Sequence, residues 1–342
     1  MGESMAKRKS RSKGMKMQPA ITDLSFTIPA GGGASADERS YIDTARELSR
    51  CNRRLYSQSR MYGYQGLTFI WRAAASYDAG GGDNRTLSTV QVSVKTAGNT
   101  WIVHNSHVKG KALWNQMNEL VLEDNPSVDG KWADYKVRLS PNMVTTRELN
   151  CLDGAGNVYL AGEWTRSIYV MPQHEVDPAS GEPLPAIELT AALIGADTTT
   201  IRSLTKAYQD SRATVFDNAP NVPAAMSDSF FNLLTDSGSQ EPELAQVIED
   251  SNDEPPYDKD IYPGVIGNGG TPVPVGFSAI SQSEVDGRIG GFVAPCGLLE
   301  IELVGYDQLG VQFPVANMPA IDILLHVAPG TYKGVAAIPM GQ

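Results

Sequence analysis

The residues of this chain best suited to chemistry are cations, and they gather near its beginning. Lysine and arginine fill six of the first sixteen positions: Lys7, Arg8, Lys9, Arg11, Lys13 and Lys16. A cation that pairs with a nucleic-acid phosphate releases condensed counterions, and this attraction does not depend on base sequence. Residues 7–18 contain no aromatic side chain, so we expect phosphate contacts there without base stacking. We interpret the segment as a phosphate-binding arm. A solubilising tail or a nuclear import signal is the alternative.

Residues 38–62 carry a second set of cations, and their spacing predicts a helix. At the helical period, one face presents Arg39, Arg46, Arg50, Arg53, Arg54 and Arg60. The opposite face presents Tyr41, Ala45, Leu48, Cys51, Leu55 and Tyr62. Asp37 is the expected N-cap, and Gly63 and Gly66 mark the expected end. Four of the cations are expected to extend the phosphate-binding surface: Arg46, Arg50, Arg53 and Arg54. The alternative is a solvated face masked by Asp43–Arg46 and Glu47–Arg50 ion pairs.

The charge of the chain is divided between its two parts. Residues 1–60 hold twelve lysines and arginines against six carboxylates, a net charge of +6. The remaining 282 residues have a net charge of −17, which gives the total of −11. A cationic end on an acidic body indicates a polyanionic partner for that end.

The composition favours strands over helices. With 33 glycines and 21 prolines the chain has many turns, and its apolar residues occur mostly in short runs. We expect an all-β fold, an eight-stranded antiparallel jelly-roll sandwich with loop insertions and an N-terminal helix. Residues 1–36 are expected to be a disordered arm and linker, with a brief edge strand possible at residues 24–28. Residues 37–342 are expected to form one domain, with an acidic insertion at about 218–264.

The expected strands follow from alternation or from short apolar runs. They cover 67–71, 90–94, 101–103, 135–139, 158–171, 187–194, 292–294, 299–303, 321–327 and 332–338, the last two as a closing pair. Short helices are expected at 111–123 and 199–208, and residues 153–157 form a hairpin turn.

Other features give weaker signals. Cys51, Cys151 and Cys296 are odd in number and far apart, so we expect reduced thiols. No apolar run is long enough to span a membrane, and no secretory signal is visible. These features favour a reducing, cytoplasm-like compartment for synthesis and assembly.

No motif in the sequence indicates catalysis or a resident metal. His104 and His107 are expected on opposite faces of a strand, where they would not share a metal ion. Nine carboxylates lie within residues 236–260. They could bind calcium, but a solvated acidic loop or a subunit contact is the favoured interpretation because EF-hand spacing is absent. We therefore expect no enzyme activity, no cofactor and no metal.

Several stretches, taken together, resemble the capsid proteins of small circular single-stranded DNA viruses known from environmental sampling, which encode a replication initiator. The stretches are the arm 7–16, Leu48–Gln58, Tyr135–Leu139, Asn252–Asp258, Tyr262–Gly264 and Ala328–Val335. The resemblance implies a jelly-roll coat subunit that assembles into an icosahedral shell around single-stranded DNA. It also implies location in the virion, and the basic cluster at 7–13 is consistent with passage through the host nucleus during assembly. It carries over no catalytic residue, and it matches the arm cations by position and type.

Two other functions fit the same sequence. One is a coat protein that packages RNA, since phosphate charge does not distinguish the two nucleic acids. The other is a jelly-roll carbohydrate-binding module or glycan-acting enzyme, in which Trp101, Trp114, Trp132 and Trp164 would stack on sugars.

Overall fold

The computed structural model describes residues 19–31, 39–71, 74–80, 83–128, 130, 134–160, 162–171, 186–213 and 270–341. The cationic arm, the acidic insertion at 218–264 and Trp132 lie outside these residues. The described part is mostly β-structure, with antiparallel pairing in its two larger sheets.

The first sheet has β3 at its centre. Its strands run in the order β1 (Asp23–Ile28), β13 (Ile321–Val327), β3 (Arg60–Trp71) and β10 (Asp286–Ile289), with β11 (Phe292–Pro295) and β15 (Ala337–Pro339) also paired to β3. The second sheet runs β2 (Arg39–Asp43), β12 (Leu298–Asp307), β5 (Asn84–Thr96) and β4 (Ser76–Asp78), with β9 (Val273–Ser281) also on β5. The short β14 (Pro329–Tyr332) precedes β15.

The two sheets form a sandwich around the main hydrophobic core. In β12, Leu299, Ile301 and Leu303 are buried, and in β13 alternate residues from Ile321 to Val327 are buried. Both strands contribute to one cluster with Phe26 of β1 and Phe69 of β3. The strands predicted at 299–303 and 321–327 are therefore confirmed, and one face of each meets the opposite sheet.

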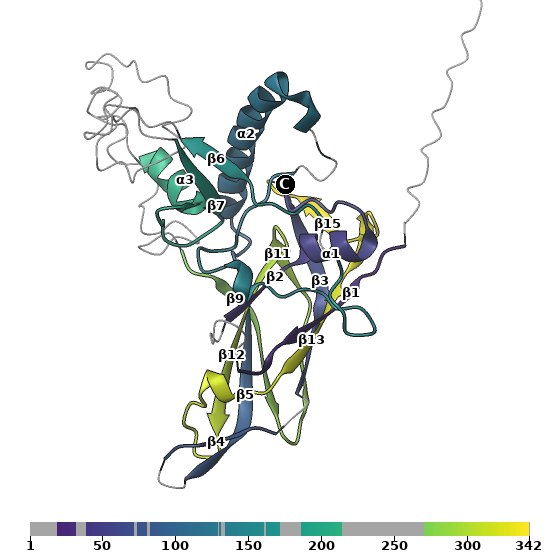
Figure 1. The fold of residues 1–342 in the computed structure, drawn as a ribbon, viewed down its shortest axis with the longest axis vertical. Helices are drawn as coiled ribbons and strands as arrows, with labels where there is room; N and C mark the ends of the chain where they lie inside the picture. The colour runs from purple at the N-terminus through teal and green to yellow at the C-terminus, as the bar shows by residue number, and fades with distance from the viewer. Residues whose placement is uncertain are drawn as a thin grey trace, which may run out of the picture.

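The chain between β5 and β9 contributes a second layer. Its described part contains α2 (Trp101–Asp124), α3 (Leu204–Ala213) and a sheet of β6 (Ile168–Met171), β7 (Ile187–Ala192) and β8 (Ile201–Ser203). In Figure 1 these elements lie together at the upper end, with α2 projecting outward. A second core joins them to the outer side of the sandwich, where Tyr41 and Leu298 pack with Val103 and Tyr169. Within the described residues, no helix is both long and apolar enough to cross a bilayer.

The helix predicted at 38–62 is wrong at both ends. Only α1 (Thr44–Asn52) is helical, and it lies between β2 and β3. The Asp43 carboxylate caps the helix by accepting the Arg46 N–H at 3.1 Å, and Arg53 ends it in the left-handed conformation. Arg39 and Arg60 belong to strands because their backbones pair with β12 and β15. Hydrogen bonding to distant strands thus outweighs a helical spacing of charges.

Three predicted strands also differ in the structure. Residues 101–103 begin α2, because the Thr100 hydroxyl caps the helix, so the expected strand and short helix form one element. Residues 135–139 are buried but form only an isolated bridge at Arg138. Of residues 158–171, only β6 is a regular strand. The predicted edge strand at 24–28 is confirmed as part of β1, so the expectation of disorder throughout residues 1–36 does not hold there.

Pairing of the last strands also differs from expectation. Residues 321–327 and 332–338 do not form a closing pair. β13 pairs with β1 and β3, and β15 pairs with β3.

Candidate nucleic-acid interface

The segment that follows the cationic arm is held by the end of α1. Asn52, the last residue of α1, accepts the Ile21 N–H at 2.7 Å and donates to the Ile21 carbonyl at 3.1 Å. Two residues later β1 begins as the edge strand of the first sheet. The arm therefore joins the folded body beside the C-terminal end of α1.

Two exposed arginines lie at this junction. Arg53 is the C-cap of α1 and adopts φ +53°, and Arg54 follows it; both are exposed. An L-residue with a side chain rarely adopts this left-handed conformation, where glycine is the usual choice. Arg53 and Arg54 thus remain available on the surface, and their predicted contact with phosphate stays a prediction.

A hairpin turn from the far end of the chain meets this junction. Lys333 and Gly334 have φ values of +51° and +99°, as in a type I′ turn between Tyr332 and Val335. The Tyr56 hydroxyl donates to the Lys333 carbonyl at 2.8 Å, and the Ser57 N–H donates to the Tyr332 hydroxyl at 3.0 Å. The Lys333 ammonium also donates to the Leu55 carbonyl. The turn is thus fixed against residues 55–57.

Cations and aromatic rings alternate where the turn docks. The Arg60 guanidinium lies 3.7 Å from the centre of the Tyr332 ring. The Lys333 ammonium lies 5.3 Å from the Tyr332 ring and 5.9 Å from the Tyr56 ring. Burial raises the pKa of Tyr56, so its phenol stays neutral at physiological pH. We call this surface the arm-root patch, made of Arg53, Arg54, Arg60, Tyr332 and Lys333, with the buried Tyr56 packed against it.

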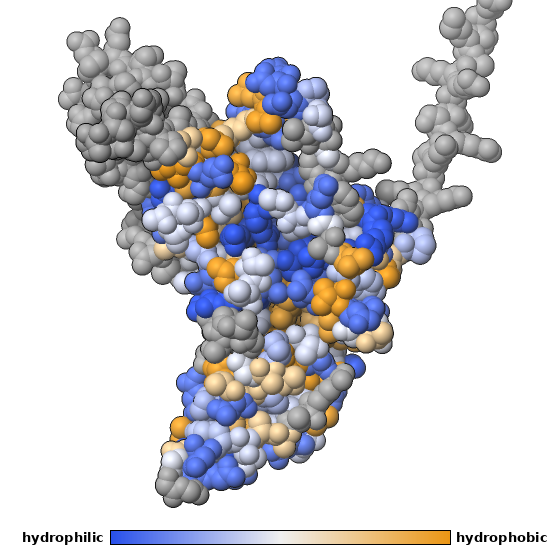
Figure 2. All heavy atoms as spheres, viewed as in Figure 1, coloured by the Kyte–Doolittle hydropathy of each residue, from blue (hydrophilic) through white to orange (hydrophobic). Residues whose placement is uncertain are grey.

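The arm-root patch combines the two means by which proteins bind single-stranded nucleic acid. Four positive side chains suit phosphates, and Tyr332, which is only half-buried, offers an aromatic ring near them. Figure 2 shows strongly hydrophilic side chains gathered over the region that α1 occupies in Figure 1.

Arg46 does not belong to this surface, and its predicted role in binding phosphate is wrong. Its side chain is 7% exposed and lies between two carboxylates, Glu47 and Glu148. It also donates to the Leu149 carbonyl at 2.8 Å. Burial lowers the pKa of Arg46, but these carboxylates outweigh the effect and raise it, so the side chain stays charged.

Arg50 is also engaged by the body of the protein. It donates to Glu47 at 3.1 Å and to the Asn150 side chain at 2.7 Å, with 12% of its side chain exposed. The predicted Glu47–Arg50 ion pair is therefore confirmed. The Asp43–Arg46 contact is a backbone cap and not the side-chain ion pair that the spacing suggested.

A buried ionic network surrounds Arg46. Arg166 bridges Asp43 at 3.1 Å and Glu148 at 2.8 Å, and Gln58 and Trp164 each donate to Asp43 at 3.0 Å. Burial raises the pKa of Glu148, but the nearby Arg166 and Arg46 outweigh burial and hold the pKa below its ordinary value. The network joins α1 to the loops at 137–149 and 164–166, so we assign it a structural role.

The sequence patterns did not indicate Tyr56, Tyr332 or Lys333 as site residues. They also placed Arg60 in a helix and not in a strand. A signal was present, because Leu48–Gln58 and Ala328–Val335 are two of the stretches on which the viral resemblance rests. They are in contact in the structure, although 277 positions separate Tyr56 from Lys333. The spacing of residues along the chain contains no information about this contact.

His104 and His107 lie in α2 and not on opposite faces of a strand, as the sequence predicted. His104 accepts the Gly341 N–H at 3.0 Å and contacts Asn99 at 2.7 Å. His107 is 1% exposed, and neither of its ring nitrogens has a hydrogen-bond partner. Within the described ranges no three His, Cys, Asp or Glu side chains are arranged to hold a metal.

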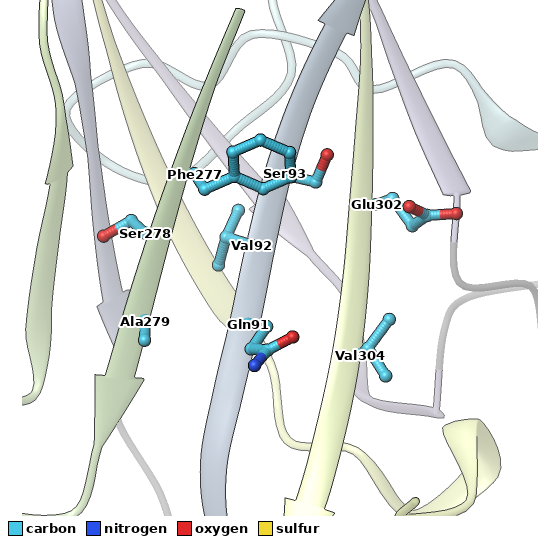
Figure 3. Close-up of a pocket in the computed structure, with 8 residues that line it drawn as sticks. All are labelled: Gln91, Val92, Ser93, Phe277, Ser278, Ala279, Glu302 and Val304. Atoms are coloured by element: carbon cyan, nitrogen blue, oxygen red, sulfur yellow. The ribbon is translucent and has the colours of Figure 1, made fainter. Parts of the chain in front are cut away.

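The outer face of the second sheet has a shallow hollow of about 400 Å³ over β9, β5 and β12. Figure 3 shows the ring of Phe277 beside Ser93, with Gln91 and Glu302 on the neighbouring strands. None of the tryptophans in the described ranges lines it. Trp164 is bound to Asp43, and Trp114 packs on Tyr135. Trp101 meets Tyr208 edge-on.

Comparison with known proteins adds no assignment. No protein-family model matches this chain, and no curated protein and no solved structure shows significant similarity to it. The function is therefore argued from the fold and the arm-root patch.

Proposed function

We propose that this chain is a viral coat subunit that assembles with copies of itself into an icosahedral shell and packages single-stranded DNA. The arm and the arm-root patch bind the phosphates of the packaged strand. The protein acts by binding and not by catalysis, and its destination is the virion.

The observation that carries the proposal is the attachment of the segment that follows the arm in sequence. The hydrogen bonds between Asn52 and Ile21 fix this segment beside Arg53 and Arg54. The chain that leads to the arm therefore starts next to exposed cations of the folded body. A tail that served only for solubility would not require a cationic and aromatic surface where it joins the body.

Strand pairing supports a jelly roll as the finer description of the sandwich. Take the eight principal strands in chain order as β1, β2, β3, β5, β9, β10 with β11, β12 and β13. The outermost strands of this series pair with each other, β1 with β13, and the pairing continues inward as β2 with β12, β3 with β10, and β5 with β9. This nested pairing is that of a long hairpin rolled into two sheets, a fold that viral capsid proteins share with lectins and cupins.

Nucleic-acid binding by the full-length protein tests the role of the arm. We would measure binding to a single-stranded oligonucleotide by fluorescence anisotropy across a range of salt concentrations. Deleting residues 1–18 should weaken binding and reduce its salt dependence. For single strands each lost phosphate contact should make the slope of log K against log salt about 0.7 shallower. Binding that is unchanged by this deletion would refute the role of the arm.

Variants of the folded surface test the arm-root patch separately. The double variant Arg53→Ala/Arg54→Ala should weaken binding in the full-length chain. Arg288→Ala is the matched control, because Arg288 is an exposed arginine on β10 outside the patch. Equal effects from the patch and control variants would mean that total charge, and not this surface, determines binding.

Electron microscopy tests the assembly. Purified protein incubated with single-stranded DNA should form closed shells, and a monomer under all salt and pH conditions would contradict the proposal. Sequencing the nucleic acid that co-purifies with the protein distinguishes a DNA-packaging from an RNA-packaging coat.

Glycan binding is the second candidate function, and the hollow on the second sheet favours it. Phe277 is 71% exposed there and is surrounded by hydrogen-bonding side chains. An exposed ring with polar neighbours suits the apolar face and the hydroxyls of a sugar. Glycan-array binding that is lost in Phe277→Ala would support this function, and no binding would refute it.

A further inference from the structure

Two of the three cysteines lie side by side in the sandwich core. The Sγ atoms of Cys51 and Cys151 are 3.4 Å apart, and the side chains are 8% and 1% exposed. Cys51 lies in the last turn of α1, and Cys151 belongs to the segment that follows the ionic network. Both are free thiols in this structure.

We propose that Cys51 and Cys151 form an oxidative modification site, in which a disulfide closes between them when the protein meets a peroxide. The proposal stands on this geometry and is independent of the coat function. In sequence the two thiols are 100 residues apart, and nothing in their spacing indicated a pair. A disulfide requires the two sulfurs to approach from 3.4 Å to about 2.05 Å.

The surrounding hydrogen bonds hold both cysteines in place. The Cys151 N–H donates to Glu47 of α1 at 2.9 Å, and the next residue, Leu152, donates its N–H to Ser25 of β1 at 2.8 Å. The Cys151 carbonyl accepts the Tyr159 N–H at 3.2 Å. The segment carrying Cys151 is therefore attached to α1 and β1 before any covalent bond forms.

The contact between the thiols selects the one that reacts first. The Cys51 thiol donates to the Cys151 sulfur, which lowers the pKa of Cys151 although burial opposes this. Cys151 is therefore the thiol that ionises and attacks the peroxide.

The reaction balances with hydrogen peroxide as the oxidant. The Cys151 thiolate attacks one peroxide oxygen, the O–O bond breaks, and the departing hydroxide takes up a proton to become water. This gives a sulfenic acid at Cys151. The Cys51 sulfur then attacks the sulfur of Cys151, the S–O bond breaks, and the hydroxide leaves as water with the Cys51 proton. In total two thiols and one peroxide give one disulfide and two waters.

Cys296 provides a control within the same chain. It is fully buried, but it belongs to the second core, whereas Cys51 and Cys151 belong to the first. All three thiols are buried, so burial does not distinguish them. Only the proximity of Cys51 to Cys151 predicts that these two react with each other and that Cys296 stays reduced.

The test is peptide mapping of the full-length protein after peroxide treatment. Free thiols are alkylated under denaturing conditions, and the digest is examined by mass spectrometry with and without dithiothreitol. We expect a reducible peptide that links Cys51 to Cys151, and alkylated Cys296. The oxidised protein should also melt several degrees higher, because the bond closes a long loop in the unfolded chain.

Two variants complete the experiment. Cys296→Ser should keep the link and the rise in melting temperature, and Cys51→Ser should lose both. If Cys51→Ser does not fold, the map of Cys296→Ser decides by itself. The proposal is overturned if Cys51 and Cys151 are both alkylated in full after oxidation, if they oxidise separately, or if either links to Cys296.

Discussion

Asn52 binds both backbone polar groups of Ile21 through its side-chain amide, accepting at 2.7 Å and donating at 3.1 Å. This pair of hydrogen bonds connects the end of a helix to the residues that lead into the edge strand β1. It fixes the direction in which the chain enters the folded body, and with it the place from which the arm extends.

The first prediction concerns Asn52→Ala, which removes both hydrogen bonds. We expect faster proteolysis near Ile21 and a loss of about 1 kcal/mol in the free energy of unfolding, because these bonds are partly exposed. Limited proteolysis followed by mass spectrometry measures the first effect. Asn150→Ala is the matched control, since it loses one exposed contact with Arg50 and should leave the cleavage rate near Ile21 unchanged. Equal cleavage in both variants would contradict this role of Asn52.

The second prediction concerns the left-handed backbone at Arg53. Arg53→Gly removes the side chain that opposes φ +53° and should leave the protein at least as stable, with a gain of up to about 1 kcal/mol. The same variant should bind single-stranded DNA more weakly, because one phosphate contact is lost. Arg53→Ala is the control. It loses the same charge but keeps the strain, so it should match the binding loss without the gain in stability. Anisotropy and thermal melting measure the two properties.

The third prediction separates Arg46 from the cations of the arm-root patch. Arg46→Met removes one of the two cationic partners of both Glu148 and Glu47, which keep Arg166 and Arg50, and should cost up to about 3 kcal/mol in the free energy of unfolding. Denaturant titration measures this loss. Arg54→Ala should cost little stability and should weaken DNA binding. A stable Arg46→Met protein with weakened binding would show that Arg46 does contact nucleic acid.

The fourth prediction concerns pH. Burial lowers the pKa of His107 from 6.5 to about 3 in the folded protein. Below about pH 6.5 the histidine is therefore protonated in the unfolded chain and stays neutral in the folded chain. The free energy of unfolding then decreases as the pH falls, by up to about 1.4 kcal/mol per pH unit.

The substitution His107→Leu should flatten this dependence between pH 6.5 and 5, as measured by thermal melting. The pKa of His104 is also lowered by burial, so His104→Gln should remove a smaller part. Below about pH 4.5 the protonation of Glu148, whose pKa is also lowered, destabilises both the wild type and the variant. An unchanged slope in His107→Leu would show that His107 does not cause it.

The strands were the most predictable elements. Alternation at 90–94 and 299–303 identified β5 and β12, because one buried face imposes a period of two on the local sequence. The same rule failed at residues 135–139. Lys136 is buried as well as Tyr135 and Val137, so the alternation there does not mark an exposed face, and the segment forms only an isolated bridge at Arg138.

The amino-acid sequence alone determined the division of charge, the strand-rich class and the location of the cationic arm in the first eighteen residues. These properties depend only on composition and on residues that are close together in the sequence. The tertiary structure decided which arginines are available. Arg46 is buried among carboxylates, and Arg39 and Arg60 lie in strands. Arg53 and Arg54 are exposed. The tertiary structure also brought Tyr332 and Lys333 to Tyr56 and Arg60, and placed Cys51 against Cys151. These contacts join residues about one hundred or more positions apart. They follow from sheet pairing and core packing, which local sequence patterns do not specify.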